Sequence, residues 1–168
     1  MRIAIVGICG AGKSTLAARL AERLGVPHVE LDAHYHQRDW EPASDEAFRA
    51  SVRAATAVDG WVVDGNYGLV RDLVWPRADR IVWLDYERLL TTRWVVGRSF
   101  ARAWDRAELW NGNRERWRSW FDADHPIRYG WRVWGPRRAE YAELADARWV
   151  RLGSPAEMER WVATLPGA

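Results

Sequence analysis

The feature that most constrains this chain is a short glycine-rich segment near its start. Residues 7–14 have the sequence GICGAGKS, which matches the pattern G-x-x-x-x-G-K-[ST] in full. An apolar stretch, Ile3 to Val6, comes directly before the segment, and a stretch with Leu16, Leu20 and Leu24 on one helical face follows it. A strand, a glycine loop and a helix in this order give the pattern its structural meaning. The segment therefore predicts a parallel α/β fold with this loop at the end of its first strand.

The same segment has the chemistry of a phosphate-binding loop. Its glycines let successive backbone N–H groups point inward, and the following helix adds its positive end, which together make a nest for anions. We expect Lys13 to bridge the β- and γ-phosphates of ATP and Ser14 to hold Mg²⁺. Lys13 is the only lysine among 25 basic residues, which argues against a chance lysine in a glycine turn, because lysine and arginine are not interchangeable in a tight site. The residues predicted to bind the cofactor phosphates are Gly7, Gly10, Ala11, Gly12, Lys13, Ser14 and Thr15.

Strand and helix patterns alternate along the rest of the chain. The predicted strands are 3–6, 28–31, 61–64, 80–85 and 149–152. The predicted helices are 13–24, 44–58, 87–106 and 126–146, followed by a closing helix with Ser154 as its N-cap and Pro155 at its first position. Alternation of this kind implies a parallel sheet covered by helices on both faces, with ligands bound at the carboxyl ends of the strands. Most strands end in glycine or aspartate: Gly7, Asp32, Asp64, Asp85 and Gly153.

Composition limits the class of protein. A length of 168 residues fits one domain, and 48% hydrophobic with 29% charged residues is typical of a globular chain. No apolar run approaches the roughly 18 residues of a membrane span, and the short apolar stretch at the start is unlike a secretory signal. The lone Cys9 cannot form an internal disulfide. We therefore expect a cytoplasmic protein without membrane contact, either a monomer or a homodimer.

Two aspartates compete for the role of the acidic partner that orients the water shell of Mg²⁺. Asp64 and Asp85 each end an apolar strand. Either could instead cap its strand end or pair with an arginine. The resemblance described next favours Asp64.

Several segments resemble adenylate kinase: residues 7–14, 60–65 and 93–98. The sequence is more similar to small bacterial proteins known as adenylate-kinase-like or DNA topology modulation proteins. These share a strand-end Leu-Asp like residues 31–32, an Asp-Gly-Asn-Tyr like residues 64–67, and helices rich in arginine and tryptophan. The resemblance implies a P-loop NTPase three-layer αβα sandwich with a five-stranded parallel sheet in the order 2-3-1-4-5. It also implies one P-loop kinase domain over residues 1–168 with a helical lid, inserted at about 107–124.

The resemblance also suggests roles for arginines near the lid. Arg98 corresponds to the arginine that enters the lid near the nucleotide, and Arg102 and Arg114 are looser candidates for clamps on the transferring phosphate. With Lys13 and Asp32, Arg98 and Arg114 are candidate catalytic residues. Adenylate kinases carry Asp-Gly-Phe-Pro-Arg where this chain has Asp-Gly-Asn-Tyr-Gly at 64–68, so the arginine that grips an acceptor phosphate is not at that position.

Polar and aromatic residues after the second and third strands predict the acceptor side. Asp32 could accept a hydroxyl proton, or it could cap a helix or pair with a histidine; sequence leaves these equal. His34 and His36 favour a polar lining or a surface pair over a metal site. An aromatic acceptor could stack on Trp40 or on the tyrosines, which could equally pack the helices. The predicted substrate-binding residues are Asp32, Tyr35, Asn66, Tyr67 and Arg71.

The second half of the chain raises an alternative. Residues 86–138 hold 12 arginines against 6 acidic residues, together with many tryptophans, which is the composition of a single-stranded nucleic-acid surface. Helical spacing such as Trp117–Trp120 favours packing instead. The hypotheses are therefore a small-molecule kinase of the nucleoside-monophosphate-kinase type that uses ATP and Mg²⁺ on a small acceptor, a nucleic-acid-binding ATPase or regulator, and, more weakly, a nucleotide sensor without catalysis.

Overall fold

The computed structural model describes residues 1–105, 109–113 and 126–166. Its centre is a five-stranded sheet with the strand order β2-β3-β1-β4-β5, and every pair of neighbouring strands is parallel. This confirms the predicted fold class. The strands are β1 Arg2–Gly7, β2 His28–Glu30, β3 Trp61–Asp64, β4 Arg80–Leu84 and β5 Trp149–Leu152.

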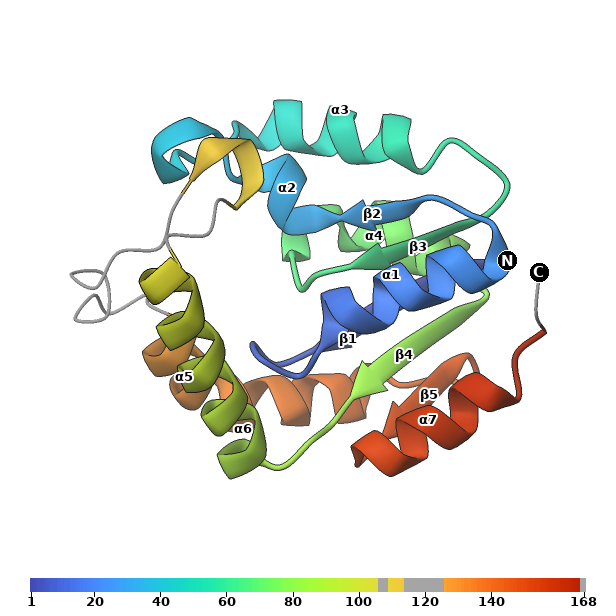
Figure 1. The fold of residues 1–168 in the computed structure, drawn as a ribbon. Helices are drawn as coiled ribbons and strands as arrows, with labels where there is room; N and C mark the ends of the chain where they lie inside the picture. The colour runs from blue at the N-terminus through green and yellow to red at the C-terminus, as the bar shows by residue number, and fades with distance from the viewer. Residues whose placement is uncertain (106–108, 114–125, 167–168) are drawn as a thin grey trace.

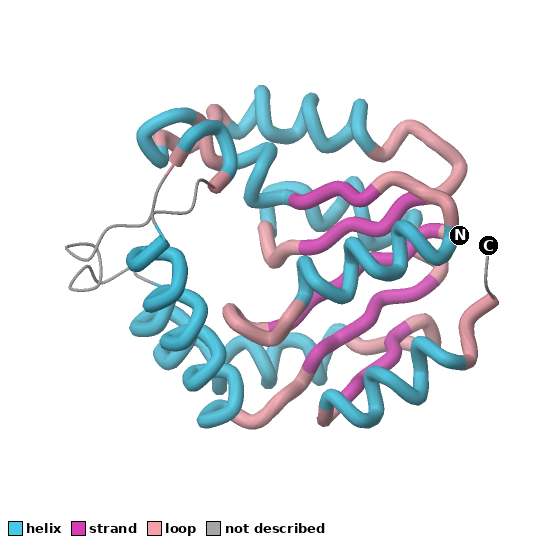
Figure 2. Tube along the Cα trace, in the orientation of Figure 1, coloured by secondary structure: helices cyan, strands magenta, loops and turns pink. Residues whose placement is uncertain are grey.

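Helices cover both faces of the sheet (Figures 1 and 2). Helices α1 and α7 pack on one face, where Ile3, Ile5 and Val82 point, and α3, α4 and part of α6 pack on the other face, against Ala4 and Val6. The longer helices are α1 Lys13–Leu24, α3 Asp45–Ala55, α5 Arg88–Asp105, α6 Pro126–Leu144 and α7 Pro155–Ala163. The short helices and 3-10 turns are α2 Leu31–Tyr35, η1 Arg38–Trp40, η2 Gly68–Val70, α4 Arg71–Val74, η3 Trp75–Arg77 and η4 Trp110–Gly112.

Both predicted serine caps are present. The side chain of Ser44 accepts a hydrogen bond from the backbone N–H of Ala47 at the start of α3, and Ser154 accepts one from Glu157 at the start of α7. Each bond pairs one of the amides that the first turn of a helix leaves without an intrahelical partner. Local side-chain chemistry thus sets where these two helices begin.

The second predicted strand is one residue too long. β2 ends at Glu30, and Asp32 lies inside the short helix α2 instead of at a strand end. The turn is closed by the backbone N–H of His36, which donates to the carbonyl of Asp32 at 2.9 Å, while Leu31 is buried in the core. The strand predicted over 80–85 ends at Leu84 and the helix predicted over 44–58 ends at Ala55. The sequence interpretation also missed the helical turns over 68–77.

The predicted lid falls mostly outside the described residues. Of the range 107–124, the structure describes residues 109–113, which include η4. The lid insertion and the single-domain boundaries remain predictions. Within the described part of the chain, none of the helices combines the length and the apolar character that crossing a bilayer requires.

Candidate active site

The glycine-rich loop lies between β1 and α1, as its sequence predicts. Gly12 is the N-cap of α1 with φ of 85°, and Gly10 has φ of 81°, conformations that residues with a side chain rarely adopt. Helix α5 packs directly on the loop at Gly10. A Cβ added there would lie 2.8 Å from the carbonyl oxygen of Thr91 and would overlap the side chain of Val95. Glycine at this position is therefore required both by the backbone angle and by the close approach of α5.

Lys13 and Ser14 begin helix α1 at the open side of this loop. Lys13 Nζ donates to the carbonyl oxygen of Ile8 at 3.1 Å, so the ammonium lies against the loop. Ser14 Oγ donates to Asp64 Oδ2 at 2.7 Å, which joins the start of α1 to the end of β3. Asp64 is only 3% exposed. A hydroxyl and a buried carboxylate thus meet beside the loop, and both supply oxygen ligands of the kind that Mg²⁺ prefers.

His28 completes the environment of Asp64 and was not singled out from the sequence. Its Nε2 lies 2.7 Å from Asp64 Oδ1, and its side chain is mostly buried. The hydrogen bond to Asp64 raises the pKa of His28 above its ordinary value, against the opposing effect of burial. A single histidine in a three-residue strand carries no signal in one sequence, because its partner is 36 residues away.

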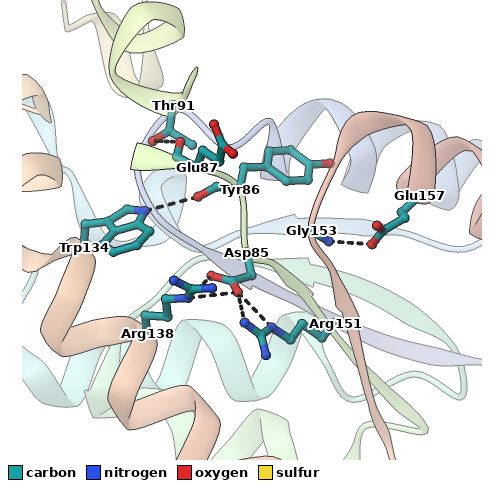
Figure 3. A network of polar contacts seen from close by, with 9 residues as sticks. All are labelled: Asp85, Tyr86, Glu87, Thr91, Trp134, Arg138, Arg151, Gly153 and Glu157. Atoms are coloured by element: carbon teal, nitrogen blue, oxygen red, sulfur yellow. Dashed lines mark hydrogen bonds and ion pairs between the residues drawn. The ribbon is translucent and has the colours of Figure 1, made fainter. Parts of the chain in front are cut away.

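Asp85, the competing aspartate, has other partners. Arg151 from β5 donates to Asp85 Oδ2 from Nε at 2.8 Å, and Arg138 from α6 donates at 3.1 Å. Figure 3 shows the two guanidinium groups on either side of this carboxylate. Asp85 therefore joins α6 and β5 to the end of β4, whereas Asp64 faces Ser14 and the loop. The geometry favours Asp64 as the partner of a metal ion.

Asn66 lies behind the glycine loop. Its Nδ2 donates to the carbonyl of Gly7 at 2.6 Å, and its Oδ1 accepts from the Gly7 N–H at 3.2 Å and from the hydroxyl of Tyr141 at 3.0 Å. Asn66 was predicted to bind the acceptor. In the structure its amide holds the backbone where β1 enters the loop, and its role toward the acceptor stays a prediction.

The acceptor side contains a hydrogen-bonded cluster around Asp32. Tyr67 Oη donates to Asp32 Oδ1 at 2.7 Å and lies 3.4 Å from His36 Nε2. The ring of Tyr67 packs against Tyr35 and Phe48. Burial and the neighbouring carboxylate raise the pKa of Tyr67, so its hydroxyl stays protonated at neutral pH. Three of the residues predicted for the acceptor, namely Asp32, Tyr35 and Tyr67, thus lie together.

The two histidines of this segment face different partners. His34 Nδ1 bonds to Ser51 Oγ of α3 at 2.5 Å, whereas His36 faces Tyr67. Burial lowers the pKa of both imidazoles below the ordinary value. Among the described residues, no group of three or more histidine, cysteine, aspartate or glutamate side chains is placed to hold a metal ion. His34 is thus held by α3, whereas His36 belongs to the cluster around Asp32.

Two of the arginines predicted for the site have described side chains, namely Arg71 and Arg98. Arg71 donates to Glu140 of α6 at 2.6 Å, and its guanidinium lies 4.4 Å from the ring centre of Trp75. Arg98 lies in α5 and is exposed. The side chain of Arg102 and the whole of Arg114 lie outside the described residues. Arg71 is thus engaged by a carboxylate and a ring.

A segment from the predicted lid packs on the acceptor side and was missed by the sequence interpretation. Trp110 Nε1 donates to Glu30 Oε2 at 2.7 Å, and the Trp110 ring stacks on His36 at 6.0 Å between ring centres. Asn111 Nδ2 donates to the backbone carbonyl of His36 at 2.6 Å. Asn113 Nδ2 donates to the carbonyl of Gln37 at 2.7 Å. The sequence indicated only a turn at residues 111–113, because the contacts join positions more than 70 residues apart.

Several arginines of the basic half pack on aromatic rings of the same chain. The Arg88 guanidinium lies 3.7 Å from the ring centre of Trp131, and that of Arg138 lies 5.0 Å from Trp134. These contacts are cation–π pairs between α5 and α6 or within α6. In the part of the chain that is described, they give a packing role to residues whose composition had suggested a nucleic-acid surface. No observation favours that alternative.

The known proteins that are similar to this chain include several kinases. No protein-family model matches the chain. It is 35% identical to the shikimate kinase of Thermobifida fusca over 99 residues, which cover 49% of this chain and 56% of that protein. It is 36% identical to the adenylate kinase of Streptomyces lividans over 87 residues, or 49% of this chain and 36% of that protein. A bifunctional pantoate ligase/cytidylate kinase of Gloeobacter violaceus is 44% identical over 59 residues, which cover 31% of this chain and 12% of that protein.

Solved structures of two kinases share the fold. A shikimate kinase from Bacteroides thetaiotaomicron has a TM-score of 0.59 at 17% identity and covers 97% of this chain and 94% of its own. A deoxyadenosine kinase from M. mycoides has a TM-score of 0.53 at 12% identity and covers 97% of both chains. The chain spans about half the length or less of the curated relatives that it matches. These relatives support a P-loop kinase likeness, and the resemblance to DNA topology modulation proteins stays a prediction.

Proposed function

We propose that this protein is an ATP-dependent phosphotransferase that transfers the γ-phosphate of ATP to a hydroxyl group of a small acceptor molecule. The observation that carries the proposal is the pairing of Ser14 with Asp64 beside a complete phosphate-binding loop. A second polar cluster, Asp32 with Tyr67, follows the neighbouring strands of the same sheet. The kinases found by comparison support the same class of reaction.

The nucleotide half of the site follows from the loop. Backbone N–H groups of the loop would surround the phosphates, and Lys13 would neutralise the charge that develops on the β- and γ-phosphoryl oxygens. Ser14 Oγ and Asp64 would hold Mg²⁺, directly or through its water shell. The bound ion would shield phosphate charge, which makes the γ-phosphorus easier to attack. Arg98, Arg102 and Arg114 would add positive charge from α5 and from the lid at about 107–124 of this single domain.

The acceptor half follows from Asp32. Tyr67 donates to Oδ1 and so holds one oxygen of the carboxylate, and Oδ2 would accept the proton of an acceptor hydroxyl. The hydroxyl oxygen forms a bond to the γ-phosphorus as the bond between the γ-phosphorus and the β–γ bridging oxygen breaks. The proton passes to Asp32, and ADP leaves with the electron pair of the broken bond.

The position of Arg71 favours a hydroxyl acceptor over a nucleoside monophosphate. An acceptor phosphate requires a cation that can turn toward it, and Arg71 is already paired with Glu140 and stacked on Trp75. Releasing it would separate a half-buried ion pair, which costs free energy. The Asp32 cluster also carries negative charge that would repel a phosphate. A neutral alcohol, nucleoside or hydroxylated metabolite fits these charges better.

An acceptor screen tests the proposal. Purified protein is mixed with ATP and Mg²⁺ and with panels of nucleosides, nucleoside monophosphates and hydroxylated metabolites, and ADP release is followed. We expect a rise that depends on a hydroxylated acceptor. Lys13→Ala should abolish the transfer without lowering the melting temperature by more than a few degrees. A flat screen with slow hydrolysis throughout, or full activity in the Lys13 variant, contradicts the mechanism.

Asp32→Asn removes the negative charge of residue 32 and keeps a side chain of the same shape. The amide oxygen can still accept the hydroxyl of Tyr67, so the local packing is kept while the proton acceptor is lost. We expect transfer to fall at least a hundredfold, within the range attributed to general base catalysis, while the affinity for ATP stays within about twofold. Equal turnover of the variant and the wild type removes Asp32 as the base.

A further inference from the structure

Both oxygens of Asp64 are engaged, each by a different partner. Ser14 Oγ donates to Oδ2 at 2.7 Å, and His28 Nε2 lies 2.7 Å from Oδ1. In the parallel pairing of β2 with β3, Glu30 lies opposite Asp64, and His28 is two residues earlier on the same strand. Side chains two apart in a strand point to the same face of the sheet. The register therefore places His28 on the face from which Asp64 meets α1.

The direction of the bond follows from the chemistry of its two groups. An ionised carboxylate can only accept hydrogen bonds, so His28 donates through Nε2–H. Asp64 is 3% exposed, and a buried carboxylate is costly unless donors satisfy it. The χ2 angle of an aspartate side chain takes a broad range of values, so the backbone alone does not fix the plane of the carboxylate. A donor on each oxygen does fix it, and His28 holds Oδ1 while Oδ2 faces Ser14.

We infer that His28 is a positioning residue for the magnesium site: it orients the carboxylate of Asp64 and thereby sets the affinity of the nucleotide complex for Mg²⁺. The inference rests on the proposed function, because it assigns the metal to Ser14 and Asp64. Partners that orient metal ligands in this way typically change metal affinity 10- to 100-fold when they are removed. His28 bonds to Asp64 and lies outside the glycine loop, so its loss should spare nucleotide binding without metal.

The test compares substitutions that keep or remove the donor. His28→Phe keeps a flat ring and removes Nε2, and His28→Gln keeps an N–H donor at the end of a side chain of similar reach. His34→Gln is the matched control, because His34 bonds to Ser51 of α3, away from Asp64. If the phenyl ring does not fit, as judged by the melting temperature, His28→Ala provides the same loss of the donor.

Two affinities are measured for each protein by calorimetry. The first is the dissociation constant of ADP in EDTA, and the second is the dissociation constant of Mg²⁺ for the protein saturated with ADP. We expect His28→Phe to weaken Mg²⁺ binding about tenfold or more, with ADP binding in EDTA unchanged within about twofold. His28→Gln should recover most of the Mg²⁺ affinity, and the His34 control should match the wild type.

The outcomes separate this inference from the proposed function. Wild-type Mg²⁺ affinity in the His28→Phe and His28→Ala variants overturns the inference alone. An equal loss of ADP affinity with and without Mg²⁺ also overturns it, because it shows a general structural role for the Asp64 pair. A wild-type protein that binds no ADP under either condition overturns the proposed function, and the inference with it.

Discussion

Replacing Asn66 by alanine should weaken both the fold and the phosphate-binding loop. The asparagine amide makes three hydrogen bonds: one to the carbonyl of Gly7, one from the Gly7 N–H and one from the hydroxyl of Tyr141. Tyr141 is fully buried, so its hydroxyl loses a partner that water does not readily replace. Alanine removes all three bonds at the point where β1 enters the loop.

The expected magnitude follows from these bonds. Each hydrogen bond contributes about 1 kcal/mol net, and a buried group left without a partner costs about 1–3 kcal/mol. Three bonds with one fully buried partner predict a loss of about 3–5 kcal/mol in the free energy of unfolding. For a protein of this size, such a loss lowers the melting temperature by roughly 6–20 °C. The affinity for ADP should fall as well, because the Gly7 peptide is no longer held in the geometry of the anion nest.

The assay combines thermal unfolding with ADP titration. Asn66→Asp is the matched control: it keeps an oxygen that can accept from Gly7 and Tyr141 but replaces the Nδ2 donor by an oxygen facing the Gly7 carbonyl. We expect its stability to lie between those of the wild type and the alanine variant. If Asn66→Ala melts within 2 °C of the wild type and binds ADP with unchanged affinity, the argument that this amide holds the loop is refuted.

Three further predictions concern other parts of the site. Gly10→Ala should lower the melting temperature about twice as much as Gly12→Ala. Both positions have a left-handed backbone, which costs alanine roughly 1–2 kcal/mol, but only at Gly10 does the added Cβ overlap α5, which costs about 1–3 kcal/mol more. Equal shifts of the melting temperature would contradict this. Burial lowers the pKa of His36 in the folded protein below its ordinary value of 6.5, so the unfolded chain binds the proton first as the pH falls. The stability that neutral His36 contributes is therefore fully present above pH 6.5 and is lost as the pH falls from 6.5 through the lower pKa of the folded state. The melting-temperature difference between wild type and His36→Phe should therefore shrink from pH 8 to pH 5, and parallel pH curves would refute the assignment. Tyr67→Phe removes the donor to Asp32. Since a hydrogen bond to a charged group contributes about 1.5–3 kcal/mol, the acceptor-dependent rate should fall by a factor of roughly 10 to 150. The affinity for ATP, measured in parallel, should stay unchanged, and a lower ATP affinity would place Tyr67 on the nucleotide side instead.

Local signals predicted much of the fold. The bounds of α1, β3 and β5 match the prediction because each is fixed by residues within it or next to it, such as Gly25, which ends α1 in the left-handed conformation. The helical turns over 68–77 were missed because their short segments carry no clear period. There Val70 and Val74 are buried against the sheet, so tertiary contacts decide the conformation.

The part of the candidate site that the sequence predicts most completely is the part whose residues are neighbours in the chain. The glycine loop, Lys13 and Ser14 form one motif whose spacing by itself predicts phosphate binding. The partner of Arg71 is Glu140, 69 residues away, and Trp110 reaches Glu30 across 80 residues. Nothing in the local sequence indicates such pairs. A single sequence therefore identifies the phosphate side of the site more fully than the acceptor side.

Asp64 and Asp85 show why the fold is needed to tell an aspartate of the candidate site from one that joins structural elements. Both aspartates directly follow or end a buried strand next to β1, and both lie on the same edge of the sheet. The strand order decides between them. β3 lies between β1 and β2, and the partners described for Asp64 include Ser14 of α1 but no arginine. Asp85 lies beside β5 and α6 instead, and two guanidinium groups donate to it. An anion already neutralised by two arginines gains little from a cation. The carboxylate of Asp64 is held by a hydroxyl and an imidazole instead of by two guanidinium groups, which is why we propose Asp64 for the magnesium site.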